Sequence, residues 1–274
     1  MEFRTDLAKE AIEKGGLGNI DGIKETSEEY KGVKINRIEI QTEKAGKKVG
    51  KPRGNYITIE INSLSTPTCE EESEREAIFY VLSKMLPSGK ILVAGLGNTD
   101  ITPDAIGPLA VSKIFATRHI SMEGVKIPGL DNLREITAIA TGVLGKTGLE
   151  AAETVKCLCK YLSPDCVIVI DALACSEFSR LGTTVQITDS GIAPGSGVKN
   201  TRKELSKDSL GVPVIAIGVP TVIDANRFNE SAKDLMVTPR DIDSLVSRAS
   251  NVLALAINKA MLPSLSFEEI ECLT

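Results

Sequence analysis

The sequence predicts an α/β protein: a three-layer α/β/α sandwich on a mainly parallel sheet, with an N-terminal β-hairpin extension. Two short β-branched runs indicate this class, one at the start of Lys90–Leu109 (KILVAGLGNTDITPDAIGPL) and one in Cys166–Ala174 (CVIVIDALA). Neither run alternates, which is typical of parallel strands that are covered on both faces. Each run also breaks into small residues and an aspartate. The third observation is that strand and helix patterns alternate from residue 90 onward.

The first third of the chain predicts the extension. Residues 1–31 are polar and contain several glycines, with one short helix expected over Asp6–Lys14. The strands VKINRIEI (33–40) and YITIEIN (56–62) alternate and form a β-hairpin within residues 32–66. The connecting segment KAGKKVGKPRGN (44–55) is rich in lysine and glycine, so we expect an exposed, mobile loop that is solvated or faces substrate. A phosphate or DNA patch is the alternative.

The remainder supplies the sandwich, and we expect residues 7–274 to form a single domain. Apolar spacing and end signals predict each element. The expected helices are Glu70–Leu86, one beginning near Ala105, Gly148–Leu162, and one from a Thr238 cap to about Met261. The expected strands are 91–97, 135–141, 166–174, 183–188 and 212–225.

Composition excludes several classes of function. The net charge of −5 argues against a general nucleic-acid-binding surface. No apolar run is long enough to span a membrane, and the charged start MEFRTDLAKE is no signal peptide, so we expect a cytoplasmic protein. The six cysteines lack a C-x-x-C pair and are expected to be buried free thiols. A single histidine, His119, argues against a Ser-His-Asp triad or a multi-histidine zinc site.

Glycine-rich turns follow several of the predicted strands. The turn GLGN (95–98) lacks the third glycine of a dinucleotide-binding fingerprint, which argues against NAD. Both GLGN and APGSGVKN (193–200) could present backbone N–H groups to an anion, either a phosphate or a developing oxyanion. Tight turns that need positive φ are the structural alternative.

Asp104 and Asp171 are the candidate catalytic residues. Asp104 follows Pro103 at a helix start, and Asp171 ends an apolar strand, where an unpaired carboxylate is costly to desolvate. Structural roles are open to both, as a helix N-terminal acid and as a hydrogen-bonding group. Ligands bind beyond the carboxyl ends of parallel strands, where both acids are expected. Two carboxylates in one crevice separate in pKa, so one could stay protonated while the other activates a water, without histidine or metal.

Five collinear motifs resemble the germination protease (spore endopeptidase) family. The match runs from about Arg4 to Ala225. The motifs are GLGNTDITPDAIGP (95–108), TGVLGKTGLE (141–150), VIVIDALA (167–174), TVQITDSGIAPGSGVKNTR (184–202) and GVPVIAIGVPTVIDA (211–225).

The resemblance implies an aspartic-type endopeptidase of the spore core that degrades small acid-soluble spore proteins during germination. It places the catalytic pair on Asp104 and Asp171 and implies a homotetramer that contacts its protein substrates, without direct nucleic-acid or membrane contact. It also implies a fold similar to that of hydrogenase maturation proteases, whose corresponding acids bind nickel together with a histidine. We expect neither metal nor cofactor. Gly97 and Asn98, with Gly195, Ser196 and Gly197, are expected to bind substrate backbone or oxyanion.

The family is made as a zymogen that removes a short N-terminal segment, and its substrates are cut after an acid in a Thr-Glu-apolar-Ala pattern. Thr5-Asp6-Leu7-Ala8 resembles that pattern, so residues 1–6 are the expected propeptide and Asp6–Leu7 the expected cleavage site. Three alternatives remain: a metal-dependent peptidase of the hydrogenase-maturation type, a phosphorylase-like or nucleoside-processing enzyme that binds phosphate on the glycine turns, and a non-catalytic scaffold or metal carrier.

Overall fold

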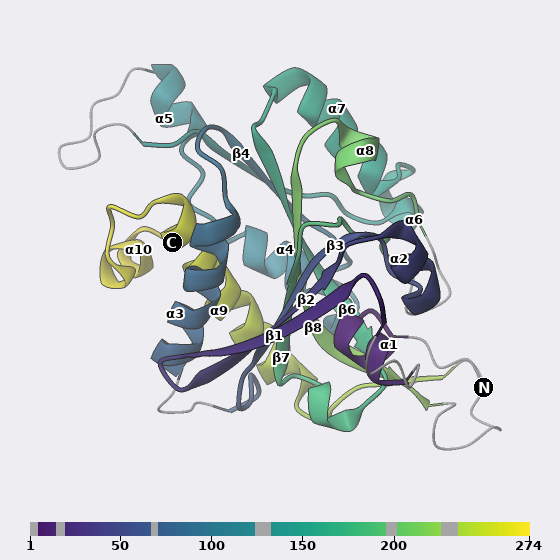
Figure 1. Cartoon of the computed structure of the whole chain (residues 1–274). Helices are drawn as coiled ribbons and strands as arrows, with labels where there is room; N and C mark the ends of the chain where they lie inside the picture. Colours follow the sequence, from purple (N-terminus) through teal and green to yellow (C-terminus); the bar gives the residue numbers. More distant parts are fainter. Residues whose placement is uncertain (1–4, 15–19, 67–70, 124–132, 196–201, 226–234) are drawn as a thin grey trace.

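One twisted sheet runs through the molecule (Figure 1). The computed structural model describes residues 5–14, 20–66, 71–123, 133–195, 202–225 and 235–274. In those residues the strand order is β1-β2-β3-β7-β8-β6-β4-β5, and β9 pairs with β8. The strands are β1 (Ile23–Tyr30), β2 (Val33–Ile40), β3 (Gly54–Glu60), β4 (Ile91–Gly95), β5 (Ile136–Ala140), β6 (Cys166–Cys175), β7 (Thr184–Thr188), β8 (Val214–Asp224) and β9 (Met236–Val237).

The strands β5, β4, β6 and β8 form the parallel part of the sheet. Ile91 of β4 pairs with Ile136 on one side and Cys166 on the other. Every residue of β4 is buried, because helices cover both faces, and this explains why the run does not alternate. The predicted α/β class with a parallel core is confirmed.

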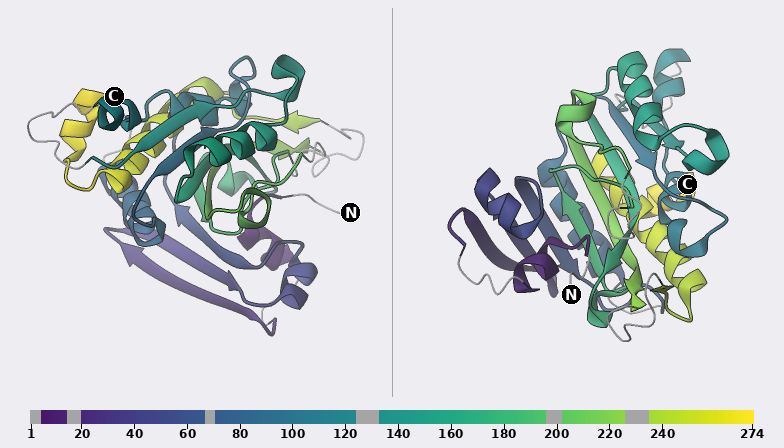
Figure 2. Two further views of the ribbon diagram at one scale, coloured as in Figure 1. Left: turned by 90° about the horizontal axis from the view of Figure 1, so that it is seen from above. Right: turned by 90° about the vertical axis from the view of Figure 1, so that its right-hand side faces the viewer.

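Helices cover the sheet as two layers, which Figures 1 and 2 show on its opposite sides. One layer contains α3, α4 and α9 and shares the largest apolar core with one face of the sheet, while α7 covers the other face. The helices are α1 (Ala8–Lys14), α2 (Glu43–Val49), α3 (Glu71–Met85), α4 (Ile106–Val111), α5 (Arg118–Glu123), α6 (Leu144–Thr147), α7 (Ala151–Leu162), α8 (Lys207–Leu210), α9 (Ile242–Met261) and α10 (Phe267–Leu273), with 3-10 turns at Thr102–Asp104 and Phe178–Arg180.

The antiparallel part of the sheet is larger than the predicted hairpin. Strands β2 and β3 pair as expected, and β3 joins β7, so the hairpin continues the main sheet. An additional strand, β1, pairs with β2 along the outer edge. Its sequence IKETSEEY is mostly exposed and polar, so it carries no apolar alternation by which the sequence could have indicated it.

The lysine-rich segment after β2 is not the exposed, mobile loop that the sequence predicted, because residues 43–49 form α2. The side chain of Thr42 caps this helix by accepting from the N–H of Ala45 (3.2 Å), and Gly50 ends it in the left-handed conformation. Ala45, Gly46 and Val49 are buried against the sheet, while the lysines between them are exposed. Three small apolar residues among lysines are too weak a pattern to predict a helix.

The cysteine prediction is partly wrong. In the described residues Cys159, Cys166 and Cys175 are buried free thiols, whereas Cys157 and Cys272 are exposed. Cys157 faces away from the sheet because it lies two positions from the inward-facing Val155 and Cys159 on α7. None of the helices in the described ranges combines the length and the apolarity that a bilayer span requires.

Candidate active site

Asp171 lies at the point where β6 extends beyond the end of the neighbouring strand β4. Strand β4 ends at Gly95, which pairs with Ile170, so β6 extends beyond β4 from Asp171 onward. The Asp171 residue is 6% exposed, and its Oδ1 accepts from the N–H of Ala172 (2.9 Å). The apolar strand therefore delivers a buried carboxyl group to the end of the parallel sheet.

Asp104 reaches the same edge through a tight turn. The GLGN segment folds around the 3-10 turn so that the N–H of Asn98 donates to the carbonyl oxygen of Asp104 (3.1 Å). Gly97 has a φ of 114°, and a Cβ at this position would lie 2.0 Å from that carbonyl oxygen. Gly107, at the start of α4, would likewise place a Cβ 2.2 Å from the carbonyl oxygen of Leu96. The glycines of this motif thus permit the close packing that fixes Asp104.

The two acids line one cavity of about 380 Å³, and both of their pKa values are raised. Burial raises the pKa of Asp104 to about 6, against a backbone hydrogen bond from Asn98 that lowers it. Burial raises the pKa of Asp171 well above its usual value, and the charges of Asp104 and Asp6 raise it further. More causes raise the pKa of Asp171 than that of Asp104, so of the two acids Asp171 retains its proton to higher pH.

The other predicted site residues are only partly brought together. Gly97 and Gly195 line the cavity with the two acids. The side chain of Asn98 instead accepts from the N–H of Asp100 (3.1 Å) within its own turn, and Asn98 is not part of the cavity lining. Ser196 and Gly197 lie outside the described residues.

The N-terminal segment enters this site along the free edge of β6. The N–H of Asp6 donates to the carbonyl of Ala174 (2.9 Å), and the N–H of Ala174 donates to Oδ2 of Asp6 (2.9 Å). Asp6 lines the cavity of the two acids. Leu7 is buried in a small cluster with Leu173, Cys175 and Ile223. The Asp6–Leu7 peptide therefore occupies the position that a bound peptide strand would take.

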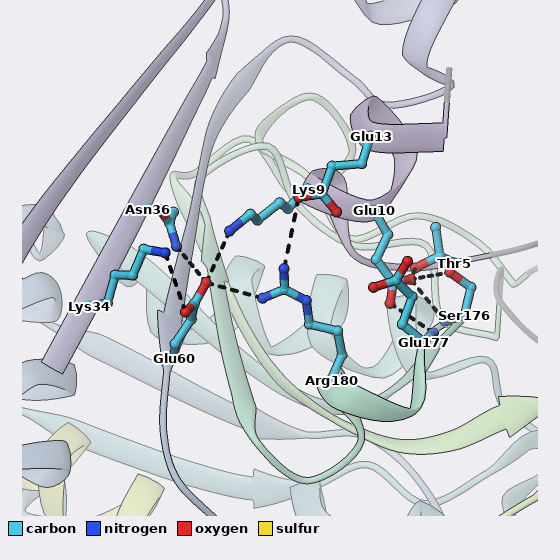
Figure 3. A network of polar contacts seen from close by, with 10 residues as sticks. All are labelled: Thr5, Lys9, Glu10, Glu13, Lys34, Asn36, Glu60, Ser176, Glu177 and Arg180. Atoms are coloured by element: carbon cyan, nitrogen blue, oxygen red, sulfur yellow. Dashed lines mark hydrogen bonds and ion pairs between the residues drawn. The ribbon is translucent and has the colours of Figure 1, made fainter. Parts of the chain in front are cut away.

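The helix that follows this peptide is anchored on two sides (Figure 3). On one side, the buried carboxylate of Glu10 accepts from the backbone N–H (2.8 Å) and hydroxyl (2.6 Å) of Ser176 and from the N–H of Glu177 (3.1 Å). The hydroxyl of Thr5 also donates to Glu10. On the other side, Lys9 forms an ion pair with Glu60 (3.0 Å). These contacts fix α1, and with it the Asp6–Leu7 peptide.

A nickel site of the hydrogenase-maturation type does not fit the described residues. They contain no group of three or more His, Cys, Asp or Glu side chains placed to hold a metal ion. His119 lies on α5 and is not among the residues that line the cavity of the two acids. Asp104 and Asp171 therefore lack an imidazole partner.

Comparison with known proteins indicates the same family as the sequence motifs. A family model described as "Germination protease" matches residues 3–232. The chain belongs to the germination protease family. The germination protease of Caldanaerobacter subterraneus is 38% identical, covering 98% of this chain and 97% of the relative. That of Clostridium tetani is 35% identical, covering 98% of both. Membership in this family makes the chain a peptidase, which is a hydrolase.

The structure of the [NiFe] hydrogenase maturation protease HycI from Thermococcus kodakarensis is also similar, with a TM-score of 0.38 and 19% identity. It aligns with 65% of this chain and 98% of that chain. At this TM-score the shared fold with hydrogenase maturation proteases stays a prediction.

Three residues that hold the N-terminal segment in this germination protease family member were not predicted from the sequence. Gln186 accepts at Oε1 from the N–H of Ala8 (2.8 Å) and donates from Nε2 to the carbonyl of Asp6 (3.0 Å). Lys51 donates to the same carbonyl (3.0 Å), and Glu10 anchors α1 as described above. Gln186 stands on the polar face of the alternating strand TVQIT, so the pattern did not indicate that it is only 5% exposed. Lys51 and Glu10 stand in charged segments without a distinguishing pattern.

Proposed function

We propose that this chain is an endopeptidase made as a zymogen, which cuts its own Asp6–Leu7 bond and then initiates degradation of small acid-soluble spore proteins during germination. The observation that carries the proposal is that Asp6 lies in the cavity lined by Asp104 and Asp171. On one side of the bond the N–H of Asp6 donates to the carbonyl of Ala174 on β6, and on the other side the Leu7 side chain is buried, as in a bound substrate strand.

The two pKa shifts support distinct roles for the two acids. Asp104, ionised above about pH 6, accepts a proton from a water whose oxygen bonds to the carbonyl carbon of Asp6. Asp171, which holds a proton, donates it to the nitrogen of Leu7 as the C–N bond breaks. The products are a carboxyl group on Asp6 and a free amine on Leu7. Residues 1–6 are then released.

Other substrates would bind in the same place once the N-terminal segment has left. The free edge of β6 offers backbone groups to an extended peptide, and Gly97 and Gly195 line the adjoining cavity. We further propose that the enzyme acts as a homotetramer in the cytoplasm of the spore core. Its partners in this proposal are protein substrates and not nucleic acid or membrane.

Intact-mass analysis of the full chain, incubated at mildly acid pH, tests this function. We expect loss of residues 1–6 in the wild type and in the exposed control variant Glu25→Gln. Asp104→Asn and Asp171→Asn should each lower the rate of loss by several orders of magnitude, because concerted catalytic groups are not replaceable singly. An unchanged mass in a preparation active on a Thr-Glu-Ile-Ala peptide would refute self-processing. Wild-type rates in either folded variant would refute the acid pair.

The phosphate-binding alternative finds less support in the GLGN turn. The N–H of Asn98 is bonded to the carbonyl of Asp104, and the N–H of Asp100 is bonded to the side chain of Asn98. Two of the groups that would cradle an anion are thus already used inside the turn, and the neighbouring carboxylate of Asp104 would repel a phosphate. If the GLGN turn is the anion site of this alternative, phosphate should raise the thermal stability of the protein, and we expect no such rise.

A further inference from the structure

The carbonyl group of Asp6 has two side-chain donors. Nζ of Lys51 lies 3.0 Å from its oxygen, and Nε2 of Gln186 also lies 3.0 Å from it. Lys51 additionally donates to the carbonyl of Thr5 (3.1 Å). Lys51 comes from the turn after α2 and Gln186 from β7, so two distant segments converge on one oxygen atom.

The setting of Lys51 is unusual for a lysine. Its hydrogen bonds to described residues go to backbone carbonyls and not to a carboxylate. Burial lowers the pKa of its amine, and the charges of Asp6 and Glu10 only partly oppose this. A partly buried amine that is held by peptide carbonyls and not by a carboxylate is costly for stability, which is typical of groups retained for function.

Gln186 fixes the register of the peptide. Its Oε1 accepts from the N–H of Ala8, so its amide nitrogen must face the carbonyl of Asp6. One side chain therefore holds the backbone on both sides of Leu7. Since Gln186 is buried within β7, its amide is positioned before any reaction begins.

The two carbonyl donors and the two acids line different cavities, and these cavities meet at Asp6. The cavity of about 380 Å³ contains Asp104 and Asp171 but neither Lys51 nor Gln186. A second cavity of about 190 Å³ contains Lys51 and Gln186 but neither catalytic acid. Asp6 lines both. Asp6 thus has the two candidate acids on one side and two carbonyl donors on the other, and hydrolysis of its peptide bond needs groups of both kinds.

We infer that Lys51 and Gln186 form the oxyanion hole of this peptidase, holding the carbonyl oxygen of the residue before the cleaved bond. The inference rests on the proposed function, since Asp6–Leu7 must be the bond that is cut. When the water oxygen bonds to the carbonyl carbon, the π electrons move to the oxygen, and the resulting negative charge faces both donors. When the C–N bond breaks, the carbonyl re-forms and the nitrogen of Leu7 takes a proton.

Lys51→Met and Gln186→Glu test the inference, because each removes donors while retaining the approximate size of the side chain. Lys51→Arg, which keeps donors, should retain part of the activity. The matched control is Lys48→Met, because Lys48 is an exposed lysine on α2, the helix directly before the turn that contains Lys51. The readouts are the first-order rate of loss of residues 1–6 by intact mass and steady-state cleavage of a Thr-Glu-Ile-Ala peptide. Thermal unfolding verifies that each variant is folded.

We expect Lys51→Met and Gln186→Glu each to lower the self-cleavage rate and the peptide kcat by about 10²- to 10³-fold with KM little changed. Lys48→Met should match the wild type. Wild-type kcat in folded Lys51→Met, or a loss confined to KM, would overturn the inference and leave the acid pair intact. If Lys51→Met does not fold, the same two results in Gln186→Glu, wild-type kcat or a loss confined to KM, would overturn the inference. A wild type that cuts neither its own Asp6–Leu7 bond nor the peptide would refute the proposed function first, and the inference with it.

Discussion

Replacing Asp104 with asparagine should stabilise the protein above pH 6, although it abolishes the proposed activity. Burial raises the pKa of Asp104 from 3.8 to about 6, so the folded state disfavours its ionisation. For such an acid, the stabilising contribution is complete below the unfolded-state pKa and is lost as pH rises through the folded-state pKa. Asparagine carries no charge at any pH and avoids this loss.

The magnitude follows from the pKa difference. A difference of about 2.2, at about 1.4 kcal/mol per pKa unit, corresponds to about 3 kcal/mol for a fully shielded group. Asp104 is only half-buried, so solvent screening reduces the expected gain to about 1.5 kcal/mol. For a domain of this size that is an increase in Tm of about 3–6 °C.

The comparison should be made in an Asp171→Asn background, which prevents self-cleavage and does not remove the burial that raises the pKa of Asp104. Thermal unfolding of the single variant and of Asp104→Asn/Asp171→Asn would be measured at pH 4 and pH 8. The double variant should be more stable at pH 8 and nearly equal at pH 4. The exposed Glu25→Gln should show no such pH-dependent difference. A double variant that is equally or less stable at pH 8 would refute the claim that Asp104 is a desolvated acid.

Two further predictions concern catalysis and packing. The self-cleavage rate should fall about tenfold per pH unit below about pH 6, because only ionised Asp104 can act as base; a rate that falls as pH rises through 6 would exchange the roles of the two acids. Gly97→Ala should lower stability by about 2 kcal/mol or more and slow self-cleavage, because its positive φ and a Cβ 2.0 Å from the carbonyl of Asp104 force that turn open. Gly145→Ala is the control, since a Cβ there would meet no atom within 4 Å; equal effects of both variants, in denaturant unfolding and intact-mass time courses, would contradict the packing argument.

The elements that sequence analysis predicted well are those whose burial is continuous. Strand β4 is apolar throughout, and β6 is apolar apart from Asp171, because helices cover both faces of the sheet, so a local pattern identifies them. Asp104 and Asp171 could be named as candidates because each interrupts or follows such a run. Strand β1 and helix α2 gave no comparable signal: one is an exposed edge strand, and the other buries only small residues among lysines.

The sequence by itself determined the α/β class and the family and named the two acids as candidates, since these depend on local patterns and on motifs that stand in order along the chain. Tertiary structure decided which groups meet at Asp6. Lys51 and Gln186 lie far apart in the sequence, yet both side chains donate to the carbonyl oxygen of Asp6. Hydrogen bonds depend on distance and direction in space, and a linear pattern contains neither until the sheet has placed β3, β7 and β6 around the N-terminal segment.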